Sequence, residues 1–166
     1  MTSPAPAEII DHALRAQDLE YERYDAQTFV VALPGEQRLK TACWLTVGAH
    51  ALEIEAFVMR APEENREQVY AYLLGRNVRM YAVSWAIDAA GDVYLSGRVA
   101  LAAVSPEELD RILGCVLEYA DGSFNQLLEL GFGSSIRREW EWRLKRGESL
   151  ANLAAFADFA QRPDTT

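Results

Sequence analysis

The sequence predicts an α+β domain, in which an antiparallel sheet carries helices on one face in the order α-βββ-α-ββ-α, followed by C-terminal helices. Segments that alternate apolar and polar residues are joined by short turns, as in antiparallel hairpins. Between and beside them, apolar residues recur at spacings of three and four, which is the helical period. A chain of 166 residues is also the size of one compact domain.

The composition is typical of a globular chain. Half of the residues are apolar and a quarter are charged, and no apolar run approaches the ~20 residues that span a bilayer. The first residues show no basic region followed by an apolar stretch, so we expect no secretory signal, a cytoplasmic location and no membrane partner. Cys43 and Cys115 lie in separate apolar segments and only two histidines are present, so we expect free thiols, no metal and no cofactor.

The charge is unevenly distributed along the chain. The formal net charge is −9, which argues against broad nucleic-acid binding because phosphate contacts need a basic surface. The segment Arg137–Arg146 carries +3, which leaves −12 for the rest of the chain. A basic segment on an acidic body predicts a contact surface for a partner or for a second copy of the chain.

The N-terminal half predicts a helix, three strands and a second helix. We expect residues 1–6 to be disordered and Pro6–Gln17, which has apolar residues at helical spacing, to form the first helix. The expected strands are Thr28–Leu33, Leu39–Val47 and Ala51–Met59. The second helix is expected to begin at Pro62, with glutamates in its first turn, and to end near Asn77.

The next segments predict a hairpin and a capped helix. The expected strands, Val78–Ile87 and Asp92–Leu101, flank a glycine-containing turn, and Gly97 predicts a bulge or a close helix crossing. Ser105 and Glu108 have the spacing of a capping box at the start of the following helix.

The C-terminal part predicts further helices. Gly122 interrupts an apolar stripe that continues beyond it, so the helix is expected to bend or break there. Two shorter helices are expected at Ser134–Arg146 and Glu148–Ala160. We therefore divide the chain into an N-terminus (1–6), an α+β domain (7–132), a helical extension packed on the domain or on a dimer mate (133–160) and a tail (161–166).

Two stretches carry a family resemblance. The stretches Gly91–Arg98, with the sequence Gly-Asp-Val-Tyr-Leu-Ser-Gly-Arg, and Ser123–Phe132, with Ser-Phe-Asn-Gln-Leu-Leu-Glu-Leu-Gly-Phe, resemble the YbjN family, and the similarity covers roughly residues 8 to 132. The extension Ser134–Arg143, with Arg146–Leu150 after it, looks like that of a subgroup of the family.

The resemblance implies a fold similar to that of type III secretion chaperones and a dimerising, protein-binding module. Members of the family have been labelled regulators of sensory transduction. The resemblance implies no catalytic residues.

Several residues have a chemical and a structural interpretation. Glu53 and Glu55 share one face of a strand, where they fit acid–base catalysis or, more commonly, a solvated surface. The stretch Gly131–Ser135 fits a phosphate cradle or, preferably, a helix end followed by a new N-cap. His12 and His50 are isolated, at a helix edge and in a turn.

The Trp/Arg segment 136–146 carries the candidate binding residues. Trp140 follows Ile136 at helical spacing, so we expect it to pack on the body of the protein. Tryptophan and arginine are enriched at protein interfaces, and they also stack on and neutralise single-stranded nucleic acid. The candidate partner-binding residues are Arg137, Arg138, Trp142, Arg143 and Lys145.

The sequence therefore predicts a non-enzymatic protein-binding module, chaperone-like or a regulatory adaptor, that acts as a homodimer. Its expected partners are a second copy of itself and another protein. A regulator linked to nucleic acid through segment 136–146 is the first alternative, and a small enzyme is the second.

Overall fold

A six-stranded antiparallel sheet is the centre of the structure, which is a computed structural model that describes residues 4–163. The helices are α1 (Pro6–Ala16), α2 (Arg66–Asn77), α3 (Pro106–Gly122), α4 (Phe124–Arg146) and α5 (Ala157–Gln161), with short 3-10 segments η1 (Leu101–Ala103) and η2 (Ala151–Phe156). The strands are β1 (Glu20–Arg23), β2 (Thr28–Pro34), β3 (Lys40–Val47), β4 (Ala51–Met59), β5 (Val83–Ile87) and β6 (Val93–Ala100). Their order across the sheet is β1-β2-β3-β4-β6-β5. The predicted α+β class is confirmed, with one strand more than predicted.

The boundaries of the chain are only partly described. Pro6 belonged both to the expected disordered N-terminus (1–6) and to the expected helix Pro6–Gln17; the structure assigns it to the helix, as the first residue of α1. The rest of that prediction falls mostly on residues 1–3, and part of the predicted tail falls on residues 164–166; both lie outside the described residues.

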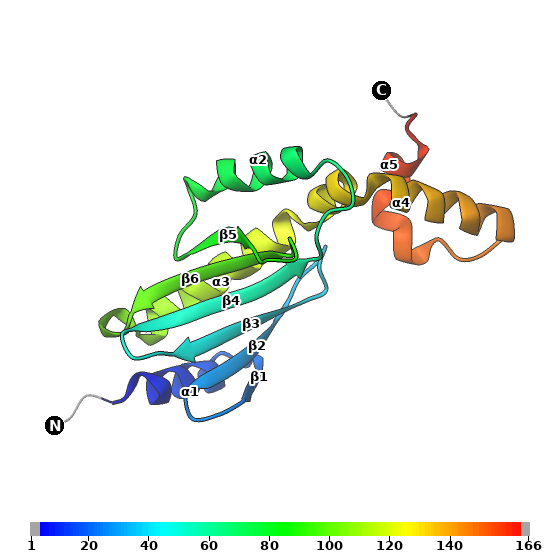
Figure 1. Ribbon diagram of the computed structural model, residues 1–166. Coiled ribbons are helices and arrows are strands. Elements are labelled where there is room, and N and C mark those ends of the chain that lie inside the picture. Colours follow the sequence, from blue (N-terminus) through cyan, green and yellow to red (C-terminus); the bar gives the residue numbers. More distant parts are fainter. Residues whose placement is uncertain (1–3, 164–166) are drawn as a thin grey trace.

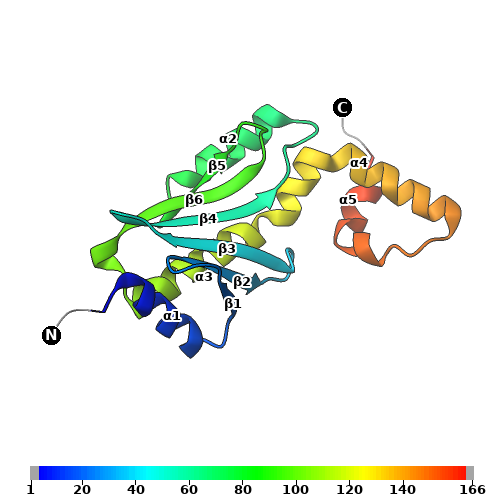
Figure 2. The same cartoon turned by 60° about the horizontal axis from the view of Figure 1, so that its bottom comes forward.

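Helices cover one face of the sheet and leave the other face open. α3 runs behind the central strands, and α1 lies beside β1 and β2 (Figure 1, Figure 2). One row of facing residues crosses five strands and is buried throughout: Val31, Cys43, Ala56, Leu95 and Trp85. The next row, with Trp44, Glu55 and Ser96, points to the open side and is exposed. The alternation that predicted the strands thus separates a core face from a solvent face.

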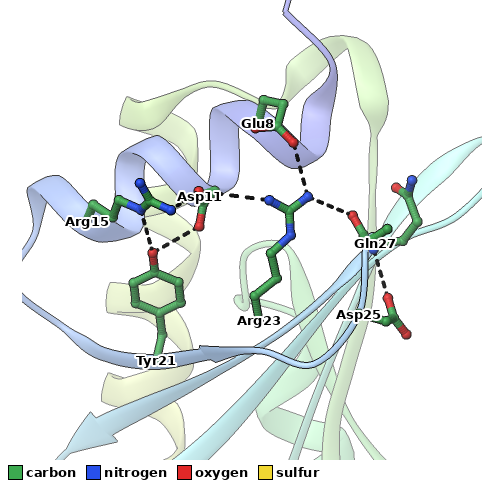
Figure 3. Close-up of polar contacts among 8 residues, drawn as sticks. Glu8, Asp11, Arg15, Tyr21, Arg23, Asp25 and Gln27 are labelled. Carbon is green, nitrogen blue, oxygen red and sulfur yellow. Dashed lines mark hydrogen bonds and ion pairs between the residues drawn. The ribbon is translucent and has the colours of Figure 1, made fainter.

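Strand β1 has no signal in the sequence, because Glu-Tyr-Glu-Arg lacks an apolar alternation. Polar contacts with α1 hold it at the edge of the sheet (Figure 3). The Tyr21 hydroxyl donates to Asp11 at 2.9 Å, and the Arg23 guanidinium donates to Glu8 at 3.0 Å. The buried Asp11 carboxylate also pairs with Arg15 at 2.8 Å. The side chains of this polar cluster bond to one another, and the cluster therefore joins α1 to β1.

Two elements begin later than predicted. α2 begins at Arg66 instead of Pro62, because residues 62–65 contact α4. β5 begins at Val83 instead of Val78, because the preceding loop is attached to α3. The Tyr81 amide donates to the Tyr119 hydroxyl at 3.0 Å, and the Tyr81 hydroxyl donates to the Glu108 carboxylate.

The N-cap of α3 is confirmed, and only half of the predicted capping box forms. The Ser105 hydroxyl oxygen accepts from the Glu108 amide at 3.1 Å. The Glu108 carboxylate accepts from Arg111 at 2.6 Å and from Tyr81, so it faces away from the cap. The predicted break is confirmed, since α3 ends at Gly122.

The interpretation of Gly97 as a bulge or a helix crossing is wrong. A Cβ at this position would lie 1.9 Å from the Ala82 carbonyl oxygen, so the close neighbour is the main chain that enters β5. The register shift in this part of the sheet lies in β4, between Phe57 and Met59.

The C-terminal helices also differ from the prediction. The segment Ser134–Arg146 is the second half of α4, which begins at Phe124 and kinks at Phe132 (φ −137°, ψ 20°). The predicted helix Glu148–Ala160 is replaced by η2 and the short α5. We call residues 133–161 the arm, because they extend away from the sheet (Figure 1).

Candidate protein-binding surfaces

The predicted binding residues all lie on the arm, and two of them stabilise it from within. The Arg137 guanidinium stacks over the Phe159 ring at 4.2 Å, which joins α4 to α5. Arg143 pairs with Glu139 at 2.6 Å and donates to the Ser149 carbonyl oxygen at 2.9 Å. These two side chains therefore hold α5 and the chain around Ser149 against α4 within the arm.

The other predicted residues share one exposed face of α4. Arg138 and Lys145 are exposed, and 44% of Trp142 is accessible to solvent. Arg146, which was not among the candidates, stacks over the Trp142 ring at 4.9 Å. We call Arg138, Trp142, Lys145 and Arg146 the cationic face; spacings of three and four from Trp142 place all four on one side of the helix.

Trp140 is buried, but not on the body of the protein. Only 8% of it is exposed, together with Ile136 and Phe156. These three residues do not belong to the main core cluster, which lies between the sheet and its helices. The arm therefore has a small apolar centre of its own, and the predicted packing of Trp140 on the body is wrong.

The loop before α2 holds the kink of α4. The Gly131 carbonyl oxygen accepts from the amides of Glu63 at 2.9 Å and Glu64 at 3.1 Å, and the Leu130 carbonyl oxygen accepts from Asn65. On the other side of the kink, the Glu64 carboxylate accepts from the Ser134 amide at 2.5 Å and from its hydroxyl at 2.9 Å. The loop thus supplies partners to backbone groups that a kink leaves free.

This clamp decides between the two interpretations of Gly131–Ser135. The Ser134 amide that would face a phosphate already bonds to a carboxylate, whereas the helical path is interrupted here, because the non-helical Phe132 separates two helical runs. The start of the second run is capped by Glu64 and not by the expected Ser134 or Ser135. The glycines instead allow close packing. A Cβ on Gly131 would lie 2.9 Å from Pro62, and one on Gly133 would lie 2.9 Å from Phe159.

A second surface lies where α2 meets β5. Side chains of both elements line an apolar groove: Tyr70, Leu73, Leu74, Trp85, Ala86 and Ile87. Leu74 is 66% exposed, Val78 85% and Ile87 48%. We call Leu74, Val78, Ala86 and Ile87 the apolar patch. Leu74 has helical spacing from Tyr70, but helical spacing alone cannot tell a covered position from an uncovered one.

The outer edge of β5 is already occupied at its centre. The Asn77 side chain accepts from the Trp85 amide at 2.7 Å and donates to the Trp85 carbonyl oxygen at 3.2 Å. These are the backbone groups that another strand would use. A partner at this edge therefore meets side chains rather than a free ladder of hydrogen bonds.

The open face of the sheet is the third surface. Trp44 is 40% exposed and meets the Tyr24 ring edge-on, with 5.7 Å between the ring centroids. A shallow hollow beside Trp44 contains Glu53 and Glu55, and Glu53 lies 3.6 Å from Arg98. Both glutamates are exposed, as their interpretation as a solvated surface requires.

The catalytic candidates do not come together. His12 is exposed on α1 and His50 is exposed in the turn between β3 and β4, and neither lines the hollow with Glu53 and Glu55. Within residues 4–163, His, Cys, Asp and Glu side chains form no group of three or more suited to holding a metal ion. Burial raises the pKa of the Cys43 thiol to about 12, which keeps it protonated. None of the helices between residues 4 and 163 is long and apolar enough to cross a membrane.

Comparisons with solved structures agree with this architecture. A chain of the ExsC–ExsE complex is 16% identical and superposes with a TM-score of 0.54, covering 73% of this chain and 92% of that one. A chain of the HopA1–SchA chaperone–effector complex is 14% identical with a TM-score of 0.52, covering 69% and 89%. The fold is therefore similar to that of type III secretion chaperones.

Sequence comparisons extend the similarity to the arm. The uncharacterized protein Rv0487 of Mycobacterium tuberculosis is 51% identical over 172 residues, covering 99% of this chain and 93% of that protein. The model of the YbjN family, described as "Putative bacterial sensory transduction regulator", matches residues 6–129 and so ends before the arm. The chain belongs to the YbjN family.

Proposed function

We propose that this chain is a cytoplasmic protein-binding module, a chaperone-like or regulatory adaptor that acts as a homodimer and performs no catalysis of its own. The observation that carries the proposal is a six-stranded sheet with one open face beside an exposed apolar patch without charged residues, in a fold similar to that of a chain from a chaperone–effector complex. Exposed apolar patches on an acidic chain are typical of interaction sites.

The apolar patch is the proposed dimer interface. Monomeric proteins protect edge strands with charge, and the edge strand β1 carries Glu20, Glu22 and Arg23. β5, at the other edge, contains no charged residue and no proline. Because Asn77 occupies the centre of that edge, two copies meet through Leu74, Val78 and Ile87 around a two-fold axis.

The open sheet face is the proposed site for a partner segment. Trp44 and Tyr24 offer exposed rings, and the uncovered strands beside them fit an extended chain. This face lies on the side of the sheet that faces away from α3 (Figure 2). Dimerisation through the patch and capture of a segment on the open face therefore use separate surfaces.

The dimer is tested by placing charge in the patch. We expect the native protein to have twice the monomer mass at tens of micromolar in size-exclusion chromatography with light scattering. Leu74→Glu combined with Ile87→Glu is expected to give a monomer, with dimer affinity lower by at least about 100-fold. Each replaced side chain loses about 1.5–3 kcal/mol of burial and adds a charge that must be desolvated.

The matched control is Leu39→Glu, because Leu39 is 79% exposed and lies in the turn between β2 and β3. This variant should remain a dimer. A native chain that is monomeric at these concentrations contradicts the dimer, and a dimer that survives both patch substitutions contradicts this interface.

A further inference from the structure

We propose that the cationic face of the arm binds an acidic segment of a partner protein. This inference rests on the proposed protein-binding function and assigns the chemistry of one contact. The face consists of Arg138, Trp142, Lys145 and Arg146. Two of these residues, Arg138 and Trp142, also line an open groove together with Ser135, Glu139, Arg143 and Glu148.

The cations of this face lack acidic partners in the part of the chain that the structure describes. Among residues 4–163, no carboxylate pairs with Arg138, Lys145 or Arg146, whereas the nearby Arg143 is neutralised by Glu139. The Arg138 guanidinium instead donates to the Ser135 hydroxyl oxygen at 3.0 Å. Glu141 has helical spacing from Arg138 and Lys145, but it forms no ion pair with either. Three positive charges are therefore available to an external anion.

The tryptophan adds an anchor between these charges. Trp142 lies one helical turn from Arg138 and one turn from Arg146, and almost half of it is exposed. Arg146 stacks on its ring and so keeps the guanidinium at the surface. Tryptophan and arginine in this arrangement are typical of the centre of a protein interface, where an apolar side chain of the partner covers the ring.

Charge favours an acidic protein segment over nucleic acid. The cationic face belongs to a segment of +3 on a chain whose remaining charge is −12. A nucleic acid extends its phosphates beyond a contact of this size and would meet the repulsion of the acidic body. A short acidic segment can stay on the arm, which projects from the sheet (Figure 1), and screening over about 8 Å separates it from more distant carboxylates.

The test measures fluorescence anisotropy with a labelled 12-residue peptide of alternating glutamate and leucine, starting at about 0.15 M salt, where the screening length is about 8 Å. We expect saturable binding that weakens as salt is raised. Arg138→Glu combined with Arg146→Glu should weaken binding at least about 10-fold, and Trp142→Ala about 5-fold. Arg60→Glu combined with Arg79→Glu makes the same charge change at two exposed positions outside the arm and should leave affinity within about 2-fold.

Any of three results contradicts the inference. The first is absence of peptide binding to the native protein. The second is equal weakening of binding by the two double variants. A 12-nucleotide single strand that binds more tightly than the peptide, with loss in the Arg138→Glu and Arg146→Glu variant, assigns the face to nucleic acid. The dimer mass is measured on the same samples, so failure of this contact is distinguished from failure of the proposed function.

Discussion

At the scale of single residues, the structure depends on a few close approaches. Ala82 has a left-handed backbone (φ 62°), and its carbonyl oxygen lies against the Cα of Gly97 in the neighbouring strand. A side chain at position 97 would therefore separate β5 from β6. Because β5 also forms half of the apolar patch, this glycine positions a surface that it does not contact.

Gly97→Ala is expected to lower the free energy of unfolding by about 2–3 kcal/mol, because the added Cβ meets a backbone atom that cannot move aside. Urea denaturation gives the measurement. Gly114→Ala is the matched control, since open space surrounds that position in α3 and alanine favours a helix by about 0.5–1 kcal/mol. Equal stability of the native protein and Gly97→Ala contradicts the packing described.

Asp121 is a second residue with a distant effect, because it fixes the turn between β2 and β3. Its carboxylate accepts from the amides of Gln37 and Arg38, each at 2.8 Å. Partial burial acts to raise the pKa of Asp121, but hydrogen bonds from the amides of Arg38, Glu36 and Gln37 outweigh it and hold the pKa below its ordinary value.

A lowered pKa in the folded state means that the charged form stabilises the fold. That stabilisation is complete above the ordinary pKa of about 3.9 and is lost as pH falls through the folded value. Asp121→Asn should therefore lower the free energy of unfolding by about 1 kcal/mol at pH 7, with the difference shrinking below pH 4. Urea denaturation between pH 7 and pH 3 measures this, and a difference independent of pH contradicts it.

At the scale of elements, α4 joins two parts of the molecule. Its first half contributes Leu127 to the main core, and its second half carries the arm. The kink at Phe132 sets the direction of the arm, and the Glu63–Asn65 loop holds the kink from both sides. The orientation of the cationic face therefore depends on a loop about 70 residues earlier in the chain.

Glu64→Ala should loosen this joint without unfolding the protein. The Ser134 amide and hydroxyl lose their acceptor, which costs about 1 kcal/mol as at other N-caps. Hydrogen exchange at residues 134–137 is expected to become about 5-fold faster. Glu67→Ala, an exposed position in the first turn of α2, is the control and should leave exchange there unchanged. Unaltered exchange in both variants shows that the clamp does not hold the arm.

At the scale of the whole molecule, three surfaces are separated. The apolar patch lies at the β5 edge, the aromatic open face lies on the sheet, and the cationic face lies on the arm. The family model ends at residue 129, so the arm is an addition to the matched domain, whereas the mycobacterial relative spans almost the whole chain. We infer that the domain supplies dimerisation and segment binding, and that the arm adds selectivity for charge.

The candidate binding site was only partly predictable. Composition located the basic segment, and helical spacing from Trp142 would have added Arg146 to the candidates. The roles within the segment were not predictable. Arg143 is neutralised by Glu139, and Arg137 stacks on Phe159, which is 22 residues away in the sequence. Nothing in the spacing identifies which aromatic ring an arginine will reach once the chain turns back at Gly147.

The sequence by itself determined the α+β class, the central strands, the N-cap at Ser105 and the break at Gly122, because alternation, capping and glycine act over a few residues. Only the tertiary structure decided the strand β1, the late starts of α2 and β5, the kink at Phe132 and the exposure of Leu74. Each of these depends on a hydrogen bond or a packing contact between distant segments, and local sequence patterns carry no information about partners brought together by folding.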